Sequence, residues 1–147
     1  MAFSPRRAVV DKAVLAARIA AIRDAVARIR SVLPQEREAL LADRTAREVV
    51  ILNLFVALQD VLSLATHWLA DEGSAVPQSY RDIFRLMGER GAVSAELAQR
   101  LAAASGLRNL VAHQYAVIDF ARIHEIATLH LGDLLQFCEE LALKDGS

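Results

Sequence analysis

The stretch VVILNLFVALQDVLSLATHWL, residues 49–69, decides the fold of this chain. Apolar residues occur on nearly every side of a helix drawn through it, and such a helix must be covered on all sides. Its longest apolar run ends at Leu58, before Gln59 and Asp60, and is too short to span a bilayer. The sequence therefore predicts the central helix of a soluble protein. Because a small bundle struggles to cover such a helix alone, we also expect a second copy of the chain.

Helical periodicity continues on both sides of this stretch, without a convincing strand pattern. Pro34 suits the first turn of the central helix, since the N–H that it lacks would be unpaired there. Ser79 with Asp82 forms a capping pair, Ser94 caps a further helix, and Asp119 begins the last one. The fold class that we predict is all-α, an up-and-down bundle of four main helices plus one short helix. The expected helices are 8–32, 34–70, 80–87, 95–113 and 119–143.

Composition sets the broad class of the protein. The chain has 147 residues, 54% hydrophobic and 24% charged, enough for a single folded domain spanning 1–147. One cysteine, Cys138, excludes an internal disulfide, and no export signal follows the first residues, so we expect a cytoplasmic protein. Nothing in the sequence resembles a metal site, because His124 and His130 lack ligand spacing and no carboxylate cluster accompanies them. We expect neither a metal nor a cofactor.

Charge is distributed unevenly although the net charge is only −1. Residues 1–31 carry seven basic side chains against two acidic ones, whereas residues 119–147 carry two basic against six acidic. A basic first helix could help to hold an RNA backbone. A solvated helix face balanced by an acidic neighbour explains the same pattern, and charge alone favours this second interpretation.

Polar residues recur along the central helix at a spacing of seven, at Asn53, Asp60 and His67. They share one side of the helix, where they could border a functional cleft or fix the register of a helix–helix interface. For Asn53 and His67 the register interpretation is slightly favoured. Asp60, a carboxylate among apolar neighbours, is the better candidate for function.

The segment LRNLVAHQY, residues 107–115, holds the polar groups that can do chemistry. His113 can exchange protons near neutral pH, and Arg108 is a permanent cation suited to phosphate. Together they match metal-free RNA cleavage, in which a base takes the 2′-OH proton and a cation stabilises the phosphorane; Asn109 could orient His113 or the substrate. The spacing R-x4-H is weak by itself, because a histidine near a helix end more often serves the helix dipole and Tyr115 more often packs.

Three stretches together resemble the HepT-like ribonuclease toxins of the HEPN superfamily: LNLFVALQDVLSLATHWLADEG, VPQSYRDIFRLMGERGAVSAELAQRL and GLRNLVAHQYAVID. The family hallmark, R-x4-6-H with a polar residue after the arginine, falls on Arg108, Asn109 and His113. The resemblance places the family's supporting acid on Asp60 and its tyrosine on Tyr115. It implies an α-helical homodimer whose two motifs meet in a shared cleft, and a metal-independent ribonuclease.

The resemblance also implies a partner. Family members act as toxins of type VII toxin–antitoxin pairs, and a MntA-type nucleotidyltransferase silences them by transferring AMP onto the motif tyrosine. In this chain Tyr115 would be the modified residue, and the negative adenylate beside Arg108 and His113 would repel RNA.

Two other functions remain open on the sequence. The chain could be a non-catalytic helical module that docks a nucleotidyltransferase and binds nucleotide or RNA, or a structural bundle dimer. His113 could be general base, general acid or phosphate binder, and the RNA could be mRNA or tRNA.

Overall fold

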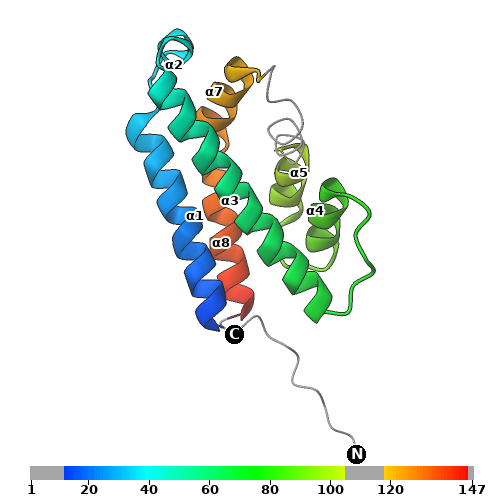
Figure 1. Cartoon of the computed structure of the whole chain (residues 1–147). Coiled ribbons are helices and arrows are strands. Elements are labelled where there is room, and N and C mark those ends of the chain that lie inside the picture. Colours follow the sequence, from blue (N-terminus) through cyan, green and yellow to red (C-terminus); the bar gives the residue numbers. More distant parts are fainter. Residues whose placement is uncertain (1–11, 105–117, 146–147) are drawn as a thin grey trace, which may run out of the picture.

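The computed structural model describes residues 12–104 and 118–145, and within them every regular element is a helix (Figure 1). This confirms the all-α class. Seven helices occur in the described residues: α1 (Lys12–Val32), α2 (Arg37–Ala42), α3 (Arg44–Asp71), α4 (Tyr80–Glu89), α5 (Ala95–Ala104), α7 (Phe120–Leu129) and α8 (Leu131–Asp145).

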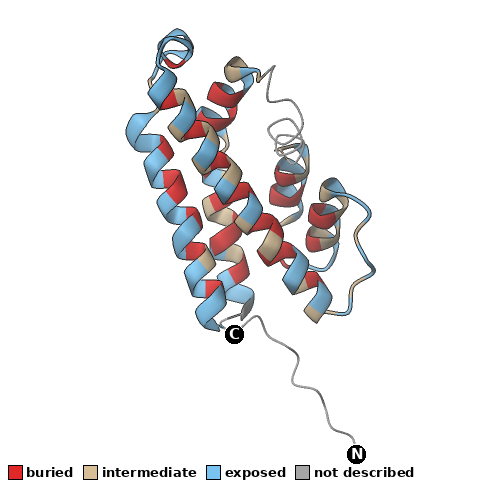
Figure 2. Ribbon diagram, in the orientation of Figure 1, coloured by how far each residue is buried: buried red, intermediate tan, exposed pale blue. Residues whose placement is uncertain are grey.

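Three long helices, α1, α3 and α8, form the centre of the bundle. Each carries apolar residues at intervals of three and four, and these positions face the neighbouring helices (Figure 2). On α8 the buried Phe137 meets Phe84 of α4 edge to face, with ring centroids 6.4 Å apart. This contact ties the smaller α4–α5 pair to the central helices.

The expected helix 34–70 is two helices, which corrects the prediction. Asp43 separates α2 from α3 with an extended backbone (φ −109°, ψ 99°), and its side chain accepts a hydrogen bond from the Ala46 N–H at 3.0 Å. A carboxylate that caps a new helix competes with continuation of the old one. Pro34 lies before α2 rather than in its first turn, and its carbonyl bonds to the Nε2 of His124 at 2.9 Å.

The expected last helix, 119–143, is also divided. Asp119 caps α7 as predicted, since its carboxylate accepts from the Arg122 N–H at 3.2 Å. The break falls at His130 (φ −120°, ψ 0°), after which α8 begins at Leu131. The His130 ring then contacts Asp133 in the first turn of α8, with Nδ1 and Oδ2 3.3 Å apart.

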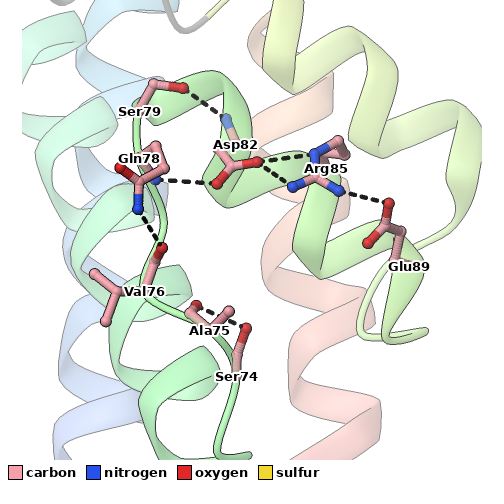
Figure 3. A network of polar contacts seen from close by, with 8 residues as sticks. All are labelled: Ser74, Ala75, Val76, Gln78, Ser79, Asp82, Arg85 and Glu89. Carbon is pink, nitrogen blue, oxygen red and sulfur yellow. Dashed lines mark hydrogen bonds and ion pairs between the residues drawn. The ribbon is translucent and has the colours of Figure 1, made fainter.

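The α4–α5 pair is fixed by local capping and by one close approach. Ser79 accepts from the Asp82 N–H at 3.1 Å and Asp82 accepts from the Gln78 N–H at 3.0 Å, which confirms the capping pair (Figure 3). Gly88 lies so near α5 that a Cβ added there would come within 2.8 Å of the Ala98 Cβ. Glycine therefore sets the distance between the two helices.

Helix α3 is also long and apolar enough, by length and composition, to cross a membrane, and it is the one such helix among the described residues. Ten of its residues are buried within the bundle. A central helix of a folded domain has the same composition for that reason.

Candidate functional site

The four motif residues Arg108, Asn109, His113 and Tyr115 lie outside the described residues. The described chain leads to them along α5, which Ser94 begins as predicted, accepting a hydrogen bond from the Leu97 N–H at 3.3 Å. It resumes after them at residue 118, just before α7. Their assigned roles therefore stay predictions. The structure does define the two helices, α5 and α7, that precede and follow the motif in the chain.

The beginning of α7 is anchored to the corner between α2 and α3. The guanidinium of Arg47, in the first turn of α3, lies over the ring of Phe120 at 5.4 Å from its centroid. The same guanidinium donates to the backbone carbonyl of Leu41 at the end of α2. A cation over an aromatic face is attractive, and here it joins three helices at one point. Arg47 has no distinguishing sequence pattern, so sequence reasoning missed it.

Asp60 is the one predicted site residue that the structure describes. Its Oδ1 accepts from the Nη1 of Arg18 on α1 at 2.9 Å, and the carboxylate is mostly buried, with 18% of its side chain exposed against 37% for Arg18. The pair joins the two longest helices at the edge of their interface. Asp60 thus pairs with Arg18, 42 positions earlier in the chain. The spacing of polar residues along α3 does not predict a partner on another helix.

Asn53 and His67, the other two polar residues of this seven-residue spacing on α3, form no ion pair like that of Asp60 in the part of the chain that the structure describes. The Asn53 amide donates to the Val49 carbonyl one turn earlier at 2.8 Å, so its hydrogen bond stays within α3. His67 is exposed. Neither one contacts another described helix through a polar bond that fixes register, so the register interpretation stays a prediction that would need a second chain.

Apolar residues on α3 near Asn53 are exposed to solvent. Leu52 and Val56, one turn apart on α3, are 62% and 39% exposed, and Phe55 beside them is half-buried. Large aliphatic side chains at adjacent positions of a central helix are costly to leave in water. The expectation that one bundle cannot cover this helix agrees with their exposure.

The other titratable side chains considered as possible ligands or nucleophiles, His124, His130 and Cys138, are engaged in contacts within the fold. His124 is buried and bonded to the Pro34 carbonyl, and His130 contacts Asp133. Burial raises the pKa of the Cys138 thiol to about 11, although the nearby Arg23 opposes the shift, so the thiol is protonated at neutral pH. Across residues 12–104 and 118–145, no three His, Cys or carboxylate side chains lie close enough to share a metal ion.

Two open hollows on the surface are not lined by Asp60. One, of about 500 Å³, lies between the end of α3 and the start of α4, around Val76 and Tyr80. The other, of about 450 Å³, lies between the start of α5 and the end of α8, around Ser94 and Glu140. The Glu140 carboxylate accepts there from the Ser94 N–H at 2.7 Å, so it holds α5 against α8.

The chain is similar in sequence and in fold to known proteins. The family model described as "Ribonuclease HepT-like" matches residues 22–141. The mRNA nuclease HepT of Shewanella oneidensis is 29% identical over 122 residues, covering 83% of this chain and 91% of that protein. The tri-AMPylated HEPN toxin of Shewanella oneidensis, solved in complex with an MNT antitoxin, has a TM-score of 0.78 at 27% identity and covers 88% of this chain and 96% of its own. A toxin–antitoxin crystal structure with AMP-PNP has a TM-score of 0.79 at 26% identity, over 88% and 97% of the two chains.

The helical fold and these similarities first define the class, an all-helical toxin of the HEPN type. The matched region includes α3, the segment 107–115 and most of α8. The chain belongs to the HepT-like ribonuclease family, and it is a ribonuclease of the toxin–antitoxin kind.

Proposed function

We propose that this ribonuclease cleaves RNA without a metal ion, using Arg108 and His113 of the R-x4-H motif. In this reaction a base removes the 2′-OH proton, the 2′ oxygen attacks the adjacent phosphorus, and the bond from phosphorus to the 5′ oxygen breaks. The 5′ oxygen leaves with a proton. His113 moves a proton, Arg108 stabilises the crowded phosphate, and Asn109 orients the histidine or the substrate. The observation that carries the proposal is the family match over residues 22–141, which includes all three residues.

Asp60 is proposed as the supporting acid of the same site. Its carboxylate is mostly buried on α3 and pairs with Arg18 at 2.9 Å. Oδ1 accepts the bond from Arg18, which leaves acceptor capacity on the second oxygen.

We further propose that the toxin is a homodimer and that the uncovered face of α3, around Leu52 and Val56, contributes to the interface. The occupant is a second copy, because the exposed aliphatic pair belongs to the same helix whose other sides form the core of the first copy. In such a dimer two Arg108–His113 pairs would share one cleft, with one motif from each copy.

The antitoxin that we propose is a MntA-like nucleotidyltransferase that transfers AMP onto Tyr115. Support comes from the similar Shewanella oneidensis HEPN toxin, which was solved tri-AMPylated and in complex with an MNT antitoxin. Adenylate carries negative charge, so on Tyr115, two residues beyond His113, it would repel a phosphate backbone. We propose that the protein acts on RNA in the cytoplasm.

Replacement of His113 tests the catalytic proposal. We expect His113→Ala to abolish RNA cleavage by the purified protein in the presence of EDTA, and to relieve growth arrest when the chain is expressed alone. His67→Ala is the matched control, since His67 is an exposed histidine elsewhere on the chain, and should cleave like wild type. If His113→Ala cleaves RNA at the wild-type rate, the proposed mechanism is wrong. If the wild-type protein binds nucleotidyltransferase and RNA but cleaves nothing at any pH, the non-catalytic binding module is the better description.

A further inference from the structure

A line of exposed basic side chains runs along one edge of α1, beside the buried Ile19 and Val26, and we call Lys12, Arg23 and Arg30 the α1 cation stripe. They are separated by eleven and seven residues, which correspond to about three and two turns, so all three project on one side within about 20°. All three are exposed. The stripe extends along the helix for about 27 Å.

The stripe differs from the other arginines of α1 in its partners. Arg18 pairs with Asp60 and Arg28 pairs with Asp24 on its own helix, at 2.9 Å in both cases. Within the described part of the chain, no carboxylate forms an ion pair with any of the three stripe residues. Their charges are therefore available to an external anion, whereas those of Arg18 and Arg28 are neutralised locally.

The surroundings of the stripe favour a phosphate backbone over a protein partner. Ala16, Ala20 and Ala27 are the exposed neighbours on this side of α1, so large aliphatic or aromatic anchors are missing from α1 there. Protein interfaces depend on such anchors, while backbone recognition needs only long side chains with cationic ends. Two carboxylates, Glu139 on α8 and Asp60 on α3, act electrostatically on the same Cys138 thiol as Arg23, and Asp60 is already paired with Arg18.

The direction of the stripe also fits a substrate that continues toward the motif. Arg30 lies near the end of α1 where α2 follows, and α7 begins at the same end of the bundle (Figure 1). The chain preceding α7 carries the motif. RNA held along α1 would therefore extend toward the end of the molecule at which the motif segment joins α7.

We propose that the α1 cation stripe is a second binding surface for the phosphate backbone of the RNA substrate, away from the catalytic residues. The proposal rests on the ribonuclease function proposed above and adds to it where the uncleaved part of the RNA lies. Contacts to phosphate oxygens carry no sequence information, so the stripe should strengthen binding of any RNA sequence about equally.

The test measures binding separately from cleavage. An unstructured single-stranded RNA oligonucleotide is titrated with His113→Ala protein, and its dissociation constant is measured by fluorescence anisotropy over a range of salt concentrations. In this background we expect the triple variant Lys12→Gln/Arg23→Gln/Arg30→Gln to lower the slope of log Kd against log salt by about 2, since each single-strand phosphate contact contributes about 0.7. The same loss corresponds to between about tenfold and about a hundredfold weaker binding near 0.1 M salt.

A matched control removes the same charge from paired arginines. Arg28→Gln/Arg44→Gln/Arg85→Gln also changes the net charge by three, but each of these exposed arginines has a carboxylate partner. We expect it to leave the salt slope nearly unchanged. Equal losses in the two triple variants would show an effect of net charge alone and would overturn the proposal, as would an unchanged slope in the stripe variant.

Three further measurements separate the remaining outcomes. Glu139→Gln should tighten RNA binding a few-fold, because it removes the carboxylate near Arg23. If the stripe variant binds RNA normally but loses its complex with the nucleotidyltransferase, the surface docks protein and the proposal is wrong. If the stripe variant loses RNA binding while the wild-type enzyme needs a metal ion to cleave, the stripe stands and the metal-free mechanism fails.

Discussion

The ion pair between Arg18 and Asp60 allows the catalytic and structural roles of Asp60 to be separated. Asp60→Asn and Arg18→Gln each remove one charge of the same ion pair, in which Nη1 and Oδ1 lie 2.9 Å apart. Because 37% of the Arg18 side chain is exposed, solvent screens the pair, and we expect it to stabilise the fold by no more than about 1 kcal/mol. The two variants should therefore lose similar amounts of stability.

A loss of this size cannot explain a large loss of activity. If the folded state is favoured by about 5 kcal/mol, the low end for natural domains, removal of 1 kcal/mol leaves only about 0.1% of the protein unfolded. A tenfold fall in cleavage rate corresponds to about 1.4 kcal/mol of transition-state stabilisation, and would thus reflect the site itself.

We expect Asp60→Asn to lower the RNA cleavage rate at least tenfold, and Arg18→Gln to keep it within about threefold of wild type. Urea unfolding gives the two stabilities, and single-turnover cleavage of a labelled RNA gives the two rates. Equal rates in the two variants, or an Asp60→Asn protein as active as wild type, would refute the assignment of Asp60 as the supporting acid and leave it as a tie between α1 and α3.

Three further predictions concern packing, assembly and the thiol. Gly88→Ala should destabilise the protein by about 1–3 kcal/mol in urea unfolding, because its Cβ would approach that of Ala98 to 2.8 Å, and adding Ala98→Gly should recover most of the loss; an unchanged midpoint would contradict the close approach. Leu52→Glu should convert a dimer into a monomer in light scattering while the chain stays folded, since Leu52 is 62% exposed in the single bundle, whereas a wild-type monomer would rule out this interface. Cys138 should resist a thiol reagent at pH 8 in the folded protein and react at once in denaturant, because burial raises its pKa to about 11; rapid reaction of the folded protein would show that α8 opens readily.

Much of the helical architecture could be predicted from the sequence because its causes are local. Ser79, Ser94 and Asp119 each cap a helix where the sequence places one, since a side-chain oxygen two or three residues before a free N–H needs no distant partner. The uncovered face of α3 could also be anticipated, because a helix apolar on every side exceeds what one small bundle covers.

The candidate site was predicted from resemblance to a family, whereas the helices were predicted from local sequence patterns. Arg108, Asn109, His113 and Tyr115 were identified by resemblance, because spacing alone does not distinguish R-x4-H from chance. The matching family model confirms the family of the chain, and the roles of these four residues stay predictions. The positions of these four side chains relative to Asp60 stay predictions.

The sequence by itself determined the helical class and the caps at Ser79, Ser94 and Asp119, while the residues proposed to act on RNA stay predictions. The break at Asp43 has a local cap on the Ala46 N–H that the sequence analysis missed. Only the tertiary structure decided that Arg47 anchors α7 through Phe120 and which arginines of α1 are paired. The physical reason is that caps and periodicity depend on neighbours a few residues away, whereas these features depend on groups far apart in the chain: Arg18 and Asp60 are separated by 42 positions. A charge pattern becomes a binding surface only when folding leaves some of its cations without partners.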